Sequence, residues 1–217
     1  MADGGMLCML KFDIGCNIGQ WIESNLQDSK IIGVEANPFI AGRVYQRFKD
    51  NTQVTIINAL VGAVDSKELD FYVEQYDPLG VASTACKEWV TGSRFTGICS
   101  WSAIRMKTIT LDSLIDQYGL PDHIKIDVEG YELEVLLGLT QVVDLISFEW
   151  AEEQKQKVID SVNYLVSMGY TKFAVLLNHD TYDYIPAGYT DYKTIIDWLK
   201  LLVVERKEKW GMIYAHI

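Results

Sequence analysis

The residues best suited to chemistry in this chain are two carboxylates, Asp127 and Glu129, at the carboxyl end of a strand-like run at 123–128. In open α/β sheets the carboxyl ends of the strands face the ligand crevice, so both acids are predicted to lie there. Like charges placed close together can raise the pKa of one carboxyl group toward neutrality and make it a general base. An acid before a helix can instead cap that helix, an alternative that suits Glu129 better than Asp127.

Two further side chains are candidates for the same role. Glu149 ends a predicted strand beside the same crevice, although it could equally be a buried partner of Lys125. His179 stands in a short polar segment after the next strand, and a lone histidine there is more often an ordinary loop residue. Carboxylates also bind Mg²⁺ or Mn²⁺, so a divalent metal is an open alternative. It is not favoured, because no DxD run or histidine stands at ligand spacing, and we assign no metal ligands.

A second motif predicts a nucleoside site. The run KFDIGCNIGQ at 11–20, followed by IIGVEANP at 31–38, is typical of a strand, a glycine-bearing loop, a helix and a second strand that ends in Glu35. Glu35 stands about 20 positions after Gly15, the separation at which an acid meets ribose hydroxyls in nucleotide-binding βαβ units. An ordinary tight turn between strand and helix would explain Gly15 alone.

The spacing of the glycines distinguishes between nucleoside ligands. A dinucleotide fingerprint needs a glycine at its middle position so that the backbone can approach a pyrophosphate, and here Asn17 stands between Gly15 and Gly19. The pattern therefore favours a nucleoside without phosphates, such as S-adenosylmethionine (SAM), over NAD.

Alternating strands and helices must position these residues. The hydrophobic pattern predicts one α/β domain over 1–217, with a mostly parallel sheet and helices on both faces. The predicted strands are 7–14, 31–35, 54–59, 123–128, 143–150, 171–178 and 210–217, and the predicted helices are 18–28, 39–49, 110–119, 131–139, 152–168 and 192–205.

An insertion at about 61–109 interrupts this alternation. Residues 68–74 and 105–109 are predicted to pair as strands, and the loop between them is rich in Gly, Ser and Thr. A long insertion of this kind is often a lid or a binding loop. Aromatic side chains here and after 171–178 could stack on sugar rings, or could simply pack the loops against the sheet. They are Trp89, Phe95, Trp101, Tyr182, Tyr184 and Tyr189.

Composition narrows the choice of partners. The net charge is −11, from 30 acidic and 19 basic residues, which disfavours nucleic acid as a partner. The chain has no apolar run near the roughly 20 residues of a membrane span and no signal peptide, so we expect a cytoplasmic protein. Its four cysteines form no CxxC pair and are expected to be reduced thiols. Because the predicted strands begin and end close to the two chain ends, the sequence could be one domain of a longer polypeptide.

In their order and spacing, FDIGCNIGQ, VEANP, TLDSLID, IKIDVEGYELEVLLGL and ISFEW resemble the FkbM family of SAM-dependent methyltransferases, over residues from about 10 to about 150. The resemblance implies a class I (Rossmann-like) methyltransferase fold with seven strands, the last antiparallel. It also implies methyl transfer from SAM to a hydroxyl group, on a sugar or glycan or on another small molecule such as a polyketide. The enzyme could also be fused to other glycan-processing domains.

The resemblance also assigns residues to the two ligands. It places Asp13, Gly15, Asn17 and Gly19 around the methionine part of SAM, Glu35 on the ribose with Asn37 nearby, and Asn58 and Ala59 along the adenine edge. It also places Ser83 and Thr84 close to the donor. The aromatic residues of the loops add Trp101 and Tyr182, and these four residues are the expected contacts of the acceptor.

Two rival functions stay open. An NAD-dependent oxidoreductase or sugar epimerase would share the βαβ unit but needs the glycine that Asn17 replaces. A non-catalytic SAM-binding or scaffolding domain would keep Glu35 and tolerate the loss of Asp127.

Overall fold

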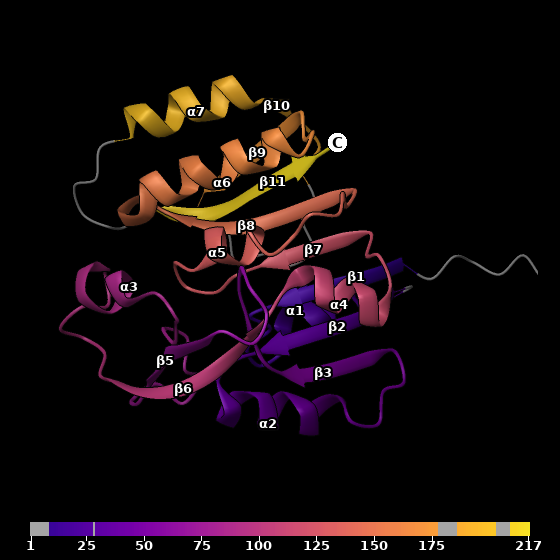
Figure 1. Cartoon of the computed structure of the whole chain (residues 1–217), viewed down its shortest axis with the longest axis vertical. Helices are drawn as coiled ribbons and strands as arrows, with labels where there is room; N and C mark the ends of the chain where they lie inside the picture. The colour runs from indigo at the N-terminus through magenta and orange to yellow at the C-terminus, as the bar shows by residue number, and fades with distance from the viewer. Residues whose placement is uncertain (1–8, 28, 178–185, 203–208) are drawn as a thin grey trace, which may run out of the picture.

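The computed structural model describes residues 9–27, 29–177, 186–202 and 209–217. They form a central eight-stranded sheet flanked by helices, with a smaller three-stranded sheet beside it (Figure 1). The central order is β10-β9-β11-β8-β7-β1-β2-β3. These strands are β1 (Met9–Ile14), β2 (Ser29–Glu35), β3 (Val54–Asn58), β7 (His123–Ile126), β8 (Leu145–Ala151), β9 (Lys172–Leu177), β10 (Thr190–Asp191) and β11 (Trp210–His216).

Strand directions match the class I methyltransferase fold. The pairs β1–β2, β1–β7, β2–β3 and β7–β8 are parallel, whereas β11 runs antiparallel to both β8 and β9. The antiparallel last strand is therefore confirmed. The predicted count of seven strands is too low by one, because Thr190 and Asp191 pair with Phe173 and Lys172 at the edge of the sheet. Two residues are too few to produce a detectable alternating pattern.

The predicted helices form, and most are shorter than expected. They are α1 (Gln20–Asn25), α2 (Pro38–Phe48), α4 (Leu111–Tyr118), α5 (Glu132–Leu136), α6 (Lys155–Ser167), which follows a short 3-10 turn at Glu152–Gln154, and α7 (Tyr192–Leu201). Asn37 caps α2 by accepting a hydrogen bond from the Phe39 amide, and Pro38 occupies the first turn, where it loses no helical bond. Within the described residues no helix has both the length and the apolar character needed to cross a membrane.

The predicted hairpin of the insertion is present. Strand β5 (Glu68–Glu74) pairs antiparallel with β6 (Trp101–Ile109), and β4 (Leu60–Val61) pairs with the end of β6. The loop between β5 and β6 contains a helix that was not predicted, α3 (Lys87–Gly92). Trp89 anchors α3, since this side chain is 2% exposed and packs with Cys86, Ala151 and Phe95. Packing, rather than stacking on a sugar, is thus the role of Trp89.

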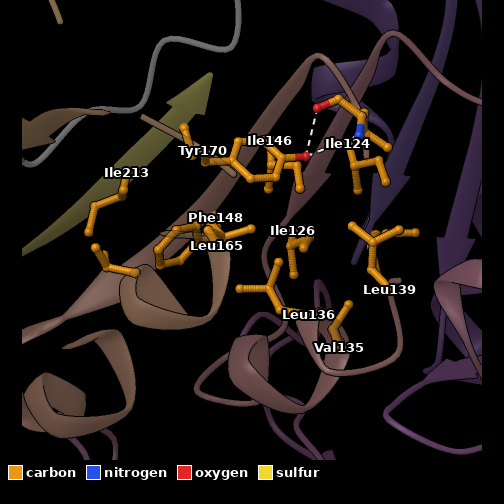
Figure 2. Close-up of a cluster of buried hydrophobic side chains, with 14 of the residues drawn as sticks. Ile124, Ile126, Val135, Leu136, Leu139, Ile146, Phe148, Leu165, Tyr170 and Ile213 are labelled. Carbon is orange, nitrogen blue, oxygen red and sulfur yellow. Dashed lines mark hydrogen bonds between the residues drawn. The ribbon is translucent and has the colours of Figure 1, made fainter. Parts of the chain in front are cut away.

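The main core lies between the centre of the sheet and α5 and α6 (Figure 2). Ile124, Ile126, Ile146 and Phe148 are completely buried, as expected for parallel strands covered on both faces. The Tyr170 hydroxyl accepts a hydrogen bond from the Val143 amide and donates one to its carbonyl oxygen, so its polar end is satisfied. This core supports the strand ends that carry Asp127 and Glu149.

Replacing Phe148 with alanine should lower the free energy of unfolding by about 3–5 kcal/mol, because it leaves a cavity in this core. Urea unfolding measures the change. Leu201→Ala is the control, since Leu201 is 81% exposed and its loss should change stability by less than about 0.5 kcal/mol. Equal effects of the two substitutions would contradict the assigned core.

Candidate functional site

A cavity of about 210 Å³ opens where β1, β2 and β7 end. Its walls also include residues of β4 and β5 and of the segment that follows β5. Gly15, Asn17, Glu35, Ala59, Ser83, Asp127 and Glu129 are the predicted site residues that line it. Residues from both predicted motifs therefore meet in one cavity, as the order β7-β1-β2 requires.

The glycine loop sits directly against the turn that follows β7. Gly15 has a φ of +80°, and a Cβ at this position would lie 1.8 Å from the carbonyl oxygen of Asp127. The Gly15 amide donates to the Val34 carbonyl at 2.8 Å, which fixes the loop to β2 as well. Only glycine fits here, for both conformational and steric reasons.

Glu35 is buried and held by two backbone donors. One carboxylate oxygen accepts from the Asn37 amide at 2.7 Å and the other from the Asn17 amide at 2.9 Å. Burial raises the pKa of Glu35 to about 7, although both hydrogen bonds oppose the shift. Each oxygen keeps a lone pair that could accept a hydroxyl hydrogen bond, so the carboxylate can receive a vicinal diol such as that of ribose.

Lys125 is a central residue of the site that the sequence analysis did not assign. Its Nζ lies 3.2 Å from Asp13 Oδ1 and 3.2 Å from Asp127 Oδ2, and donates to the Gly15 carbonyl at 3.4 Å. Burial lowers the pKa of Lys125, but Asp127 and Asp13 outweigh this effect and raise it above the ordinary value. Lys125 is therefore a permanent ammonium that joins both strand ends. Asp13 is fully buried beneath the cavity and does not line it.

Lys125 stands two residues before Asp127, and residues two apart in a strand point to the same face. This spacing is the sequence signal that could have predicted their contact. The alternative that paired Lys125 with Glu149 is wrong, since the two aspartates occupy the ammonium.

Three carboxylates gather beside the cavity. Oxygen atoms of Asp127, Glu129 and Glu149 all lie within 4.8 Å of one another. Burial, followed by the neighbouring charge of Asp127, raises the pKa of both Glu129 and Glu149 well above the usual range, and Arg94 opposes the shift. Groups this close can share a proton, or a hard cation.

Glu129 does not cap a helix. It adopts a φ of 57°, and α5 begins after Tyr131 without a side-chain cap. The Thr84 hydroxyl donates to the Glu129 carbonyl at 2.7 Å, which secures this unusual backbone conformation. The capping alternative is therefore excluded, and the Glu129 side chain lines the cavity.

Besides Asp13, three predicted cofactor residues lie outside the cavity lining. Gly19 precedes α1, and a Cβ there would meet the Phe48 ring, so this glycine serves helix packing. The Asn58 amide donates to the carbonyls of Glu35 and Ala36 and supports β2. Asn37 caps α2 and donates to the Ser83 hydroxyl at 3.3 Å.

The structure places the predicted acceptor contacts in different positions. Thr84 is fully buried, and its hydroxyl donates a hydrogen bond to the Glu129 carbonyl. The Trp101 indole donates to the Ala82 carbonyl at 2.9 Å and does not line the cavity. His179 and Tyr182 lie outside the described residues. Further lining residues that sequence patterns did not reveal are Trp21, Phe71, Leu79, Gly80, Val81 and Tyr131.

Comparison with known proteins identifies the family. Residues 13–200 match the family described as the methyltransferase FkbM domain. The chain belongs to the FkbM methyltransferase family. The match extends well past residue 150, where the recognisable motifs end, and so includes β9 and α7.

A curated relative of this FkbM methyltransferase is the hexuronic acid methyltransferase AglP of Haloferax volcanii. It is 27% identical over 139 residues, which make up 63% of this chain and 52% of AglP. The chain thus spans about half the length of this relative.

Solved structures similar to this one include other methyltransferases. Precorrin-6y C5,15-methyltransferase from Geobacter metallireducens has a TM-score of 0.49 at 14% identity, covering 96% of this chain and 81% of its own. Fibrillarin from Aeropyrum pernix, solved with natively bound SAM, has a TM-score of 0.47 at 11% identity, covering 96% and 66%.

Binding of S-adenosylhomocysteine (SAH) should depend on pH through Glu35. We expect the ionised carboxylate to accept the ribose hydroxyls, and burial raises its pKa to about 7. The Kd should therefore rise by roughly thirtyfold as the pH falls from about 8.5 to about 5.5. Calorimetric titration measures the Kd. Glu35→Gln should bind at least about tenfold more weakly than the wild type at pH 8.5, and without pH dependence. The exposed Glu23→Gln on α1 is the control and should keep the wild-type profile. A pH-independent wild type, or preferential binding of NAD, would contradict the assignment.

Proposed function

We propose that this FkbM-family protein is a SAM-dependent O-methyltransferase that acts on a hydroxyl group of a sugar or glycan in the cytoplasm. The observation that carries the proposal is the single cavity with Glu35 on one side of the Gly15 loop and the Asp127 and Glu129 carboxylates on the other. A ribose-binding acid and a candidate general base thus face the same space.

Glu35, Gly15 and Asn17 would hold SAM, with Ala59 on the adenine side. Family membership makes SAM the expected methyl donor. Asn17 stands where a dinucleotide site needs glycine, and it donates its backbone amide to Glu35 rather than leaving room for a pyrophosphate.

SAM supplies an activated sulfonium methyl group. The protein must align the acceptor oxygen, exclude water and take the hydroxyl proton as the new carbon–oxygen bond forms. Glu129 is our choice for the proton acceptor, because burial and neighbouring acids make its carboxylate more basic than an ordinary one. Asp127 is fixed by Lys125 and is suited to orient the hydroxyl.

The charge of the cavity favours a neutral acceptor. Glu35, Asp127 and Glu129 line it, and Lys125, the one basic residue among its described lining, already serves two aspartates. AglP is described as acting on a hexuronic acid, which supports a sugar acceptor. The acidic lining of this cavity would, however, repel the carboxylate of a hexuronic acid. Trp21, Phe71 and Tyr131 offer aromatic surface for a sugar ring.

Turnover of simple sugar probes tests this proposal. Wild-type protein should transfer methyl groups from SAM to neutral methyl hexosides, and more slowly to methyl glucuronoside, with products detected by mass spectrometry. Glu129→Gln and Asp127→Asn should each lower kcat by about 10²–10⁴-fold while SAH still binds. Addition of EDTA should leave the rate unchanged.

Three results would contradict the proposal: full activity in both variants, methylation of nitrogen instead of oxygen, or preference for the glucuronoside. Loss of activity with EDTA and recovery with Mg²⁺ would instead assign the three carboxylates to a cation.

A further inference from the structure

Residues 77–83, here called the strap, form part of the cavity wall. Leu79, Gly80 and Val81 line the cavity, and Leu79 and Val81 are 39% and 44% exposed. The strap is therefore a partly exposed segment of the wall of the proposed cofactor site.

The strap has a shape of its own. The Asp77 carboxylate accepts hydrogen bonds from the amides of Leu79 and Val81, and the Asp77 carbonyl accepts one from the Gly80 amide. Gly80 has a φ of +59°, as this turn requires. These internal hydrogen bonds fix the shape of the turn but not its position at the cavity. Its position therefore depends on hydrogen bonds to residues outside the strap.

Five side chains from elsewhere supply those outside bonds. The Trp101 indole donates to the Ala82 carbonyl at 2.9 Å, and the Glu74 carboxylate accepts from the Asp77 amide at 2.6 Å. The Asn17 side-chain amide donates to the Leu79 carbonyl at 2.9 Å. The Arg43 guanidinium donates to the Pro78 carbonyl, and the Asn37 amide donates to the Ser83 hydroxyl at 3.3 Å. Of these five side chains, Asn17 lines the cavity, whereas Arg43 lies on the exposed side of α2.

Asn17 combines conformation and contact in a way that glycine could not. Its φ is 45°, a left-handed conformation that asparagine tolerates better than most residues. Its backbone amide donates to Glu35 and its side-chain oxygen accepts from the Ile18 amide at 2.7 Å. The residue that departs from the dinucleotide pattern thus links the strap to the ribose-binding acid.

We propose that Asn17 is a positioning residue whose side-chain amide fastens the strap at the cavity and slows the escape of the bound nucleoside. This inference rests on the proposed function, since it takes SAM and SAH as the nucleosides held there. The strap must open for exchange, and each turnover then includes release of the Leu79 carbonyl by Asn17.

Surface plasmon resonance with SAH tests the proposal without any acceptor. Asn17→Gly keeps the left-handed backbone and removes the bond to Leu79, so the SAH dissociation rate should rise roughly fivefold. Arg43→Ala loosens the strap from outside the cavity and should raise the rate by about threefold or more. Gln46→Ala, an exposed change on the same helix, is the matched control and should leave the rate unchanged.

Each other outcome has a distinct meaning. Dissociation rates of Asn17→Gly and Arg43→Ala within about twofold of the wild type would contradict the proposal that the strap slows the release of SAH. An effect of Asn17→Gly without any effect of Arg43→Ala would also overturn it, in favour of a purely local role in the loop. A folded wild type that does not bind SAH would overturn the proposed function itself.

Discussion

The contact between Gly15 and the Asp127 carbonyl is the constraint on which the site depends. A Cβ at position 15 would lie 1.8 Å from that oxygen, so the glycine loop and the turn after β7 can pack together only without a side chain. Lys125 reinforces this contact because its ammonium meets Asp13, Asp127 and the Gly15 carbonyl at once. Removing Lys125 or one of the two aspartates would leave a buried charge unpaired. The arrangement is therefore stable only when all three charged side chains are present.

The distribution of charge follows from this contact. Lys125 neutralises Asp13 below the cavity and steadies Asp127 at its wall, while Arg94 is engaged by Glu153 through two hydrogen bonds of 2.8 and 2.9 Å. Glu129 and Glu149 are left with raised pKa values and no ion-pair partner of their own among the described residues. A carboxylate of this kind is a stronger base than one in water, and Glu129 lines the cavity.

Local patterns were sufficient to predict most of the fold and the two main motifs. Glu35, Asp127 and Glu129 were identified because their positions follow from strand ends and glycine spacing, which are short-range properties of the chain. The pairing of Lys125 with Asp13, the strap and α3 depend on contacts between segments far apart in sequence. Asn17 and Leu79, for example, are joined by a hydrogen bond that no local pattern records.

A crystal structure of the SAH complex would test the central claim most directly. The account predicts both ribose hydroxyls within about 3 Å of the Glu35 carboxylate, and the sulfur facing Asp127 and Glu129. A nucleoside bound away from Glu35, or a sulfur directed away from the two carboxylates, would contradict it.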